Sequence, residues 1–188
     1  MFAIGLAACG GAATSGPAAS GGDREGRMRA AAATQPEDAE SVFGPLEVGA
    51  DYLAYRKVTD KPFQSLDHGN RWVDVYVNAI GAAAYLSGAP VPVGTIVVKT
   101  SWQNADGHPT DVAGPLFVME KRAPGYDPPR DDWYYAIRWA EPPPAERARF
   151  GGPFYWRGKS ARIAYCWECH DGYDRRLGGL TPSSQLPR

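Results

Sequence analysis

The feature that most constrains this chain is a pair of cysteines followed directly by a histidine near the C-terminal end. Cys166, Cys169 and His170 form a C-x-x-C-H pattern, which is typical of covalent attachment of a c-type haem. The two intervening residues let both thiols reach the vinyl groups at one porphyrin edge, where they form thioethers. The adjacent histidine then donates an imidazole nitrogen to the iron. The pattern predicts one haem c, held by Cys166 and Cys169 and ligated by His170.

Three other kinds of site use paired cysteines, and the sequence leaves them open as alternatives. A thioredoxin-like dithiol would lie in a βαβ unit, and none is recognisable around residue 166. A zinc site would need more ligands, and His68 and His108 lack partners at metal-binding spacing. A disulfide across two residues is strained and is rarely used as a staple. Haem attachment is the favoured interpretation.

Length and composition suit a single domain built from strands. The 188 residues are enough for one hydrophobic core, and the formal net charge of −1 gives no electrostatic case for binding nucleic acid. The chain contains 22 Gly, 17 Pro, six Trp and ten Tyr. This mixture favours short strands joined by punctuated loops over the four-helix bundle of many c-type cytochromes.

The N-terminal segment resembles the end of a bacterial lipoprotein signal. Residues 6–10 read Leu-Ala-Ala-Cys-Gly, which predicts lipidation of Cys9. Because only eight residues precede Cys9 and none of them is basic, we expect residues 1–9 to be a truncated signal whose start lies further upstream. The alternative is an unmodified, disordered tail. An exported, lipid-anchored protein in the periplasm or on the outer surface agrees with haem attachment, which takes place outside the cytoplasm.

The rest of the chain divides by composition. Residues 10–40 are rich in Ala, Gly, Ser and Pro and predict a disordered linker. Residues 41–180 carry the apolar patterning and the haem motif, so they predict the globular haem domain. Residues 181–188 predict an irregular tail. Within the domain, residues 42–58 could begin it as either a helix or a strand.

Alternating and β-branched stretches predict four strands in the domain. They cover residues 72–78, 93–102, 116–122 and 133–140. A short helix is expected over 79–88, a loop over 103–115 and a break at 141–146. Because short loops join the strands, we expect a mainly β (α+β) fold: an antiparallel meander with a few short helices and a C-terminal haem-binding segment.

This layout resembles the cytochrome P-460 family of small exported mono-haem proteins, which have a mostly antiparallel β fold. The stretches that carry the resemblance are 72–78, 93–99, 116–128, 133–135 and 166–170, and together they span roughly residues 68 to 175. Of these, only the haem motif is specific by itself. The order of the other stretches adds weight to the resemblance.

The resemblance implies a site and an activity. Lys99, in 94-GTIVVK-99, matches a family lysine that is covalently joined to the porphyrin. The implied haem has a five-coordinate iron with His170 on one side and an open position on the other. Family enzymes oxidise hydroxylamine, which implies a small nitrogen-oxide substrate, a redox partner protein and a homodimer. Thr100 departs from the acidic residue that is common after this lysine, which bears on activity more than on fold.

Other functions of the same haem stay open. The cytochrome c′-beta branch of the family lacks the crosslink and binds nitric oxide. A third possibility is an electron carrier in which Met119 is the sixth ligand, although its place on a predicted strand favours a core position. Glu120 is a candidate proton acceptor over the haem, or else it pairs with Lys121 or Arg122. His68 and His108 lie in polar turns and are expected at the surface.

Overall fold

The computed structural model describes residue 43 and residues 46–177. Cys9, the signal over 1–9, the linker over 10–40 and the tail over 181–188 lie outside the described residues, so these predictions stay predictions. None of the described helices is long and apolar enough to cross a membrane.

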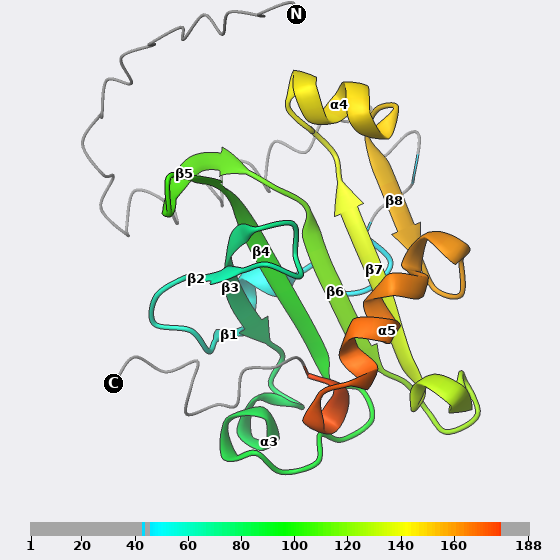
Figure 1. Cartoon of the computed structure of the whole chain (residues 1–188). Coiled ribbons are helices and arrows are strands. Elements are labelled where there is room, and N and C mark those ends of the chain that lie inside the picture. The colour runs from blue at the N-terminus through cyan, green and yellow to red at the C-terminus, as the bar shows by residue number, and fades with distance from the viewer. Residues whose placement is uncertain (1–42, 44–45, 178–188) are drawn as a thin grey trace, which may run out of the picture.

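One antiparallel sheet organises the domain (Figure 1). Its eight strands follow the order β1-β3-β4-β6-β7-β8, with β2 added to β3 and β5 added to β4. The expected mainly β, antiparallel meander is therefore confirmed. The strands are β1 Arg56–Lys57, β2 Phe63–Ser65, β3 Arg71–Val77, β4 Ile96–Ala105, β5 His108–Ala113, β6 Leu116–Lys121, β7 Trp133–Trp139 and β8 Phe154–Arg157.

Short helices connect and cover the strands. The α-helices described are α3 Ala82–Ser87, α4 Pro144–Phe150 and α5 Ala164–Asp171. Single 3₁₀ turns are η1 Tyr52–Ala54, η2 Pro128–Arg130, η3 Ala161–Ile163 and η4 Asp174–Arg176. The helix expected within 79–88 is confirmed as α3, and it ends where Gly88 adopts a left-handed φ of 80°.

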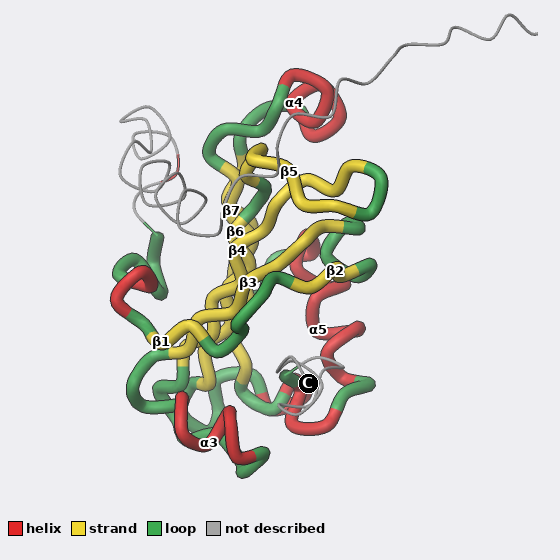
Figure 2. Tube along the Cα trace, turned by 90° about the vertical axis from the view of Figure 1, so that its left-hand side faces the viewer, coloured by secondary structure: helices red, strands yellow, loops and turns green. Residues whose placement is uncertain are grey.

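The two faces of the sheet are covered by different parts of the chain. Figure 2 shows the sheet nearly edge-on, with α5 on one side and η1 on the other. The haem motif thus lies on one face only, against the strands. In Figure 1, α5 crosses in front of the lower part of β6 and β7.

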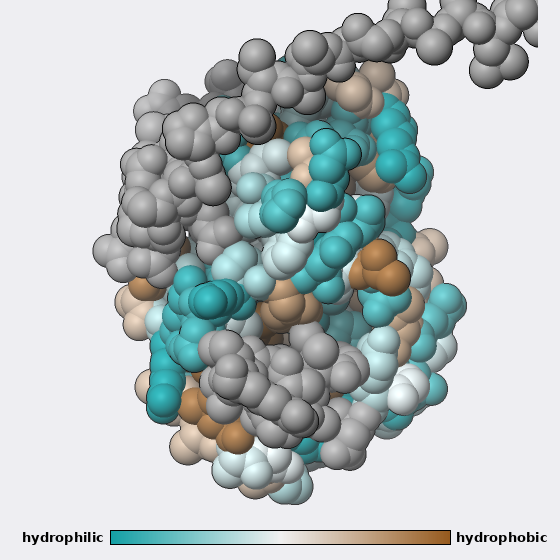
Figure 3. Space-filling view, turned by 60° about the vertical axis from the view of Figure 1, so that its left-hand side comes forward, coloured by the Kyte–Doolittle hydropathy of each residue, from teal (hydrophilic) through white to brown (hydrophobic). Residues whose placement is uncertain are grey.

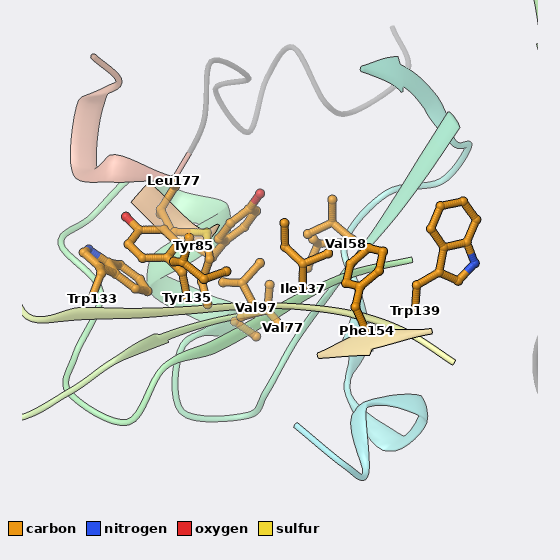
Figure 4. Packing of buried hydrophobic residues seen from close by; sticks show 14 residues of the cluster. Val58, Val77, Tyr85, Val97, Trp133, Tyr135, Ile137, Trp139, Phe154 and Leu177 are labelled. Atoms are coloured by element: carbon orange, nitrogen blue, oxygen red, sulfur yellow. The ribbon is translucent and has the colours of Figure 1, made fainter. Parts of the chain in front are cut away.

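Alternation along the strands sorts the apolar side chains into two cores. Trp133, Tyr135, Ile137 and Trp139 share one face of β7, as the alternation of side chains along a strand requires, and Figure 4 shows them on the same side as Val97. Their neighbours pack on the opposite face beneath η1 in a second cluster, which includes Tyr134. The alternation in 72–78 predicts a half-buried strand. That prediction is wrong, because β3 is covered on both sides.

The loop and connection predictions need two corrections. The stretch 103–115 is not a loop throughout, because β4 runs on to Ala105 and turns into β5. Asp106 and Gly107 make that turn with φ values of 50° and 79°, the left-handed pair of a tight hairpin. The second correction is β8, which forms within the segment leading to the haem motif. The apolar run of β8 is short and has glycines on both sides, so the sequence pattern does not predict a strand there.

The outer surface displays few large apolar residues. Leu66, Ile80 and Val93 are the most exposed of them in the described chain. On the face shown in Figure 3, brown residues are scattered among teal ones. Scattered exposed apolar residues are usual for globular domains.

A glycine at the start of α3 tests this packing. A Cβ built on Gly81 would lie 2.2 Å from Cγ2 of Thr95, a side chain that is fully buried. Gly81→Ala should therefore lower the free energy of unfolding by roughly 1–3 kcal/mol, because a buried contact is overpacked. Urea unfolding measures the change.

Gly172→Ala is the matched control for that substitution. A Cβ built on Gly172 would have the carbonyl oxygen of Cys169 as its nearest atom, at 3.7 Å. The φ of −75° at Gly172 also suits alanine. Its stability should change by less than about 1 kcal/mol. Equal losses in the two variants would contradict the close approach of α3 to Thr95.

Candidate functional site

The three residues of the haem motif share one face of α5. On a helix, positions separated by three and four residues are neighbours, so Cys166, Cys169 and His170 project together. All three line a cavity of about 360 Å³ between α5 and the sheet. His170 is buried, Cys166 is half-buried and Cys169 is exposed. The motif therefore reaches from the cavity interior to its rim.

The wall opposite α5 is largely apolar. Strands β4, β6 and β7 supply most of it, and Leu177 closes the side near the C-terminal end of the described chain. The apolar and aromatic lining residues include Phe63, Val97, Phe117, Met119, Tyr135 and Leu177. A cavity of this size with a few inward polar groups is typical of sites for small molecules and cofactors.

The peptide backbone holds the imidazole of His170 in one orientation. Its Nδ1 lies 2.6 Å from the carbonyl oxygen of Arg176, and a carbonyl can only accept a hydrogen bond. Nδ1 therefore carries the hydrogen and Nε2 is left as the nitrogen with a free lone pair. Burial, with the charge of Lys99, lowers the pKa of His170 to about 3, so the ring is neutral at pH 7. A neutral imidazole anchored through Nδ1 is the form that ligates metals.

Lys99 enters the same cavity from the middle of the sheet. In the strand register it lies between Val75 on β3 and Phe117 on β6, so it shares the face of the α5-side core. Its side chain is 5% exposed, and its Nζ lies 3.4 Å from Nε2 of His68. Burial lowers the pKa of Lys99 to about 8. The fold thus brings Lys99 and the haem motif, far apart in sequence, to one cavity.

The two cysteines are free thiols in this structure. Burial raises the pKa of the Cys166 thiol to about 12, so it is protonated at neutral pH. The described strands pair only antiparallel, so they contain no parallel βαβ unit of the kind a thioredoxin-like dithiol uses. Within the described part of the chain, no group of three or more His, Cys, Asp or Glu side chains could hold a metal ion. The described residues therefore lend no support to the zinc alternative.

One of the two histidines expected at the surface lies elsewhere. His68 is half-buried and lines the cavity, with its ring 4.6 Å from that of Phe117 between centroids. The prediction for His68 is therefore wrong, whereas His108 on β5 is exposed as expected. Sequence reasoning missed His68 because it lies in a polar turn, and the turn folds over the sheet. His68 comes three residues after the end of β2, whose sequence Phe-Gln-Ser gives little signal for a strand.

Glu120 and Met119 lie on opposite faces of β6. Glu120 is absent from the cavity lining and its carboxylate accepts a hydrogen bond of 2.8 Å from Nε of Arg122. The structure therefore places Glu120 away from the position of a proton acceptor over a haem, and it shows the ion pair that was the alternative. Met119 is buried in the core, as expected, and also lines the cavity.

Comparison with known proteins does not extend this assignment. No protein-family model matches the chain, and a search of curated proteins finds no significant match.

The residues present fit a covalently attached haem. Two thiols and an imidazole with a free Nε2 line one cavity, and apolar side chains form the opposite wall. The hydroxyl of Tyr135 is buried there without a hydrogen-bond partner among the described residues. A porphyrin would meet the apolar wall, and its polar substituents offer partners to such a group. The donor set and the wall therefore agree with the haem predicted from the motif.

The buried amine of Lys99 makes stability depend on pH in the haem-free protein. Its folded pKa of about 8 is below the ordinary 10.5, so the unfolded chain binds more protons between these values. Stability should therefore rise as the pH increases from 8 to 10.5. Lys99→Met removes the cost of burying the charge, so at pH 7 it should be more stable than the parent by roughly 3 kcal/mol. Urea unfolding at pH 7 and pH 10.5 measures both effects.

Lys121→Met is the matched control. Lys121 lies on the neighbouring strand and pairs with Asp131 at 2.8 Å. We expect no gain at pH 7 from this substitution. A gain for Lys99→Met that is the same at both pH values would contradict a buried, titrating amine.

Proposed function

We propose that this protein is an exported mono-haem c-type cytochrome that oxidises hydroxylamine or a related small nitrogen oxide. The observation that carries the proposal is that Lys99 shares one cavity with Cys166, Cys169 and His170. The C-x-x-C-H motif accounts for the haem alone. Burial of an amine beside that motif is what the cytochrome P-460 resemblance requires in addition, and a simple electron carrier has no need for it.

The chain's own residues would hold the haem at defined atoms. The thiols of Cys166 and Cys169 would add to two vinyl groups, with each S–H hydrogen passing to a vinyl carbon, and Nε2 of His170 would be the ligand to the iron. The bound haem supplies one-electron oxidation and reduction at its iron. The hydrogen bond from Nδ1 of His170 to the Arg176 carbonyl fixes the ligand's tautomer and raises its basicity.

Lys99 would contribute a third covalent attachment. Only the neutral amine is nucleophilic, and its pKa of about 8 makes that form available near neutral pH. The bond would replace one N–H and one porphyrin C–H, so its formation needs a two-electron oxidant such as a peroxide. The porphyrin would then be held from α5 on one side and from β4 on the other.

The apolar wall would keep water from the open side of the iron. Phe117 and Met119 on β6 face the cavity, and neither supplies an acid or base. A small, neutral molecule such as hydroxylamine suits such a space better than a large or charged one. The released electrons would leave to a separate redox partner protein. We also propose the periplasm or outer surface as the location, a lipid anchor at Cys9 and a homodimer, on the sequence and the family resemblance.

Mass spectrometry of haem peptides tests the covalent attachments. Protein from a host that attaches haem c should give one haem on the peptide that contains Cys166 and Cys169. It should also link that peptide to the one that contains Lys99, and its reduced spectrum should be strongly red-shifted. Lys99→Arg should abolish the link and the red shift, because a guanidinium stays protonated.

Lys121→Arg controls for the loss of a lysine on the neighbouring strand and should retain the link. A haem on the two cysteines without any link to Lys99 would redirect the proposal to the nitric-oxide-binding function. A folded, colourless protein would overturn it altogether.

A further inference from the structure

The cavity contains a second histidine that the C-x-x-C-H motif does not include. The rings of His68 and His170 both line it, with their centroids 6.4 Å apart and their planes at 81°. His68 comes from the turn between β2 and β3, and His170 from α5. The two imidazoles therefore approach one another from different parts of the chain.

Each imidazole is anchored through Nδ1. The Nδ1 of His68 lies 2.6 Å from Oγ of Ser65, and that of His170 lies 2.6 Å from the Arg176 carbonyl. Nζ of Lys99 lies 3.4 Å from Nε2 of His68. An ammonium can only donate, so Nε2 of His68 is the acceptor and its Nδ1 carries the hydrogen. Both rings thus adopt the tautomer in which Nε2 carries the lone pair that a metal would use, and in His68 that lone pair now accepts from Lys99.

The separation of the rings distinguishes two roles for His68. If both Nε2 atoms bound one metal ion from opposite sides, the two metal–nitrogen bonds would each be about 2.0–2.1 Å long. Adding the distance from each nitrogen to the centre of its ring gives a centroid separation close to the 6.4 Å found. A substrate molecule between the iron and His68 would need a further bond and a hydrogen bond in line, which the 6.4 Å separation does not accommodate. The spacing therefore favours direct ligation over a contact to bound substrate.

We propose that His68 is the second axial ligand of the haem iron in the resting protein, opposite His170. This inference rests on the haem attachment of the proposed function. Its consequence is that the open position is closed when no substrate is present. Formation of the Lys99–porphyrin bond would engage the amine that now contacts His68 and so release its Nε2 for the iron.

The position of His68 suits a ligand that can leave. Its turn, residues 66–70, joins a strand of three residues to β3, and Leu66 in this turn is 75% exposed. The hydroxyl of Tyr173 donates to Asp67 at 3.1 Å and Nζ of Lys99 contacts His68, so these two polar contacts join the turn to the rest of the cavity wall. Met119 offers the contrast, because β6 is paired on both sides by β4 and β7. A small molecule could displace the turn but not the strand.

The test is the spin state of the purified ferric haem protein. The parent should give the optical and electron paramagnetic resonance spectra of low-spin iron with two imidazole ligands. His68→Ala and His68→Gln should both give high-spin iron while retaining the haem, and added imidazole should restore the low-spin spectrum in His68→Ala. Cyanide should bind His68→Ala about tenfold more tightly than the parent, because a closed site lowers the apparent affinity.

Two matched variants make the assignment specific. His108→Ala, on the exposed hairpin, and Met119→Leu should both stay low-spin. A high-spin parent, or loss of the low-spin spectrum in Met119→Leu with its retention in both His68 variants, would overturn the inference. Haem linked to Lys99 with high-spin iron would overturn only this inference, whereas a protein without haem would overturn the proposed function as well.

Discussion

The site depends on the buried ammonium group of Lys99, which forms no salt bridge with a described carboxylate, although the charge of Asp67 favours its protonated form. Of the described residues, His68 supplies the one polar side chain within hydrogen-bond distance of Lys99. Burying a charge in this way costs free energy, which appears as the lowered pKa of Lys99. A lysine whose role is only structural would be replaced by an apolar residue at little cost. A lysine at the centre of a sheet is therefore more consistent with a chemical role for its amine than with a contribution to the stability of the fold.

The strand register is what makes that burial unavoidable. Lys99 lies between Val75 and Phe117 on neighbouring strands, so its side chain has no edge of the sheet to reach. A slip of one residue would turn Lys99 to the opposite face and bring Val98 to the cavity. The two apolar clusters, one on each side of the sheet, hold the register in place, since a slip would exchange their members. Packing on both sides of the sheet thereby determines which side chains of β4 face α5.

Sequence patterns predicted the parts of the fold that depend on local periodicity. The four strands expected from alternating and β-branched stretches correspond to β3, β4, β6 and β7, and the short helix expected over 79–88 is α3. The position of His68 could not be predicted in this way, because it depends on how a polar turn folds over distant strands. The hairpin after Ala105 is not predicted from the sequence, because turn-forming residues occur throughout 103–115 and mask the short strand β5.

The alternation of side chains along a strand also limits which residues can belong to the candidate site. Met119 and Glu120 are adjacent on one strand, so only one of them can face a given cofactor. Met119 faces the cavity and Glu120 pairs with Arg122 on the other side. Choosing between the two faces requires knowing where α5 packs, which no local pattern contains. The grouping of Cys166, Cys169 and His170 is predictable from the sequence, because residues three and four positions apart share one face of a helix.

The hydrogen bond to His170 has a consequence for how this site can vary. Its acceptor is the main-chain carbonyl of residue 176, reached because the backbone there turns with a φ of 56° at Arg176. Any amino acid presents the same oxygen, so the acceptor that sets the tautomer of His170 is a main-chain atom and not a side chain. The path of the chain positions that oxygen, so a change in length between α5 and η4 would alter the orientation of the His170 ring. A change in residue type would do so only where the new residue is strained at this left-handed φ, as Pro or a β-branched residue is.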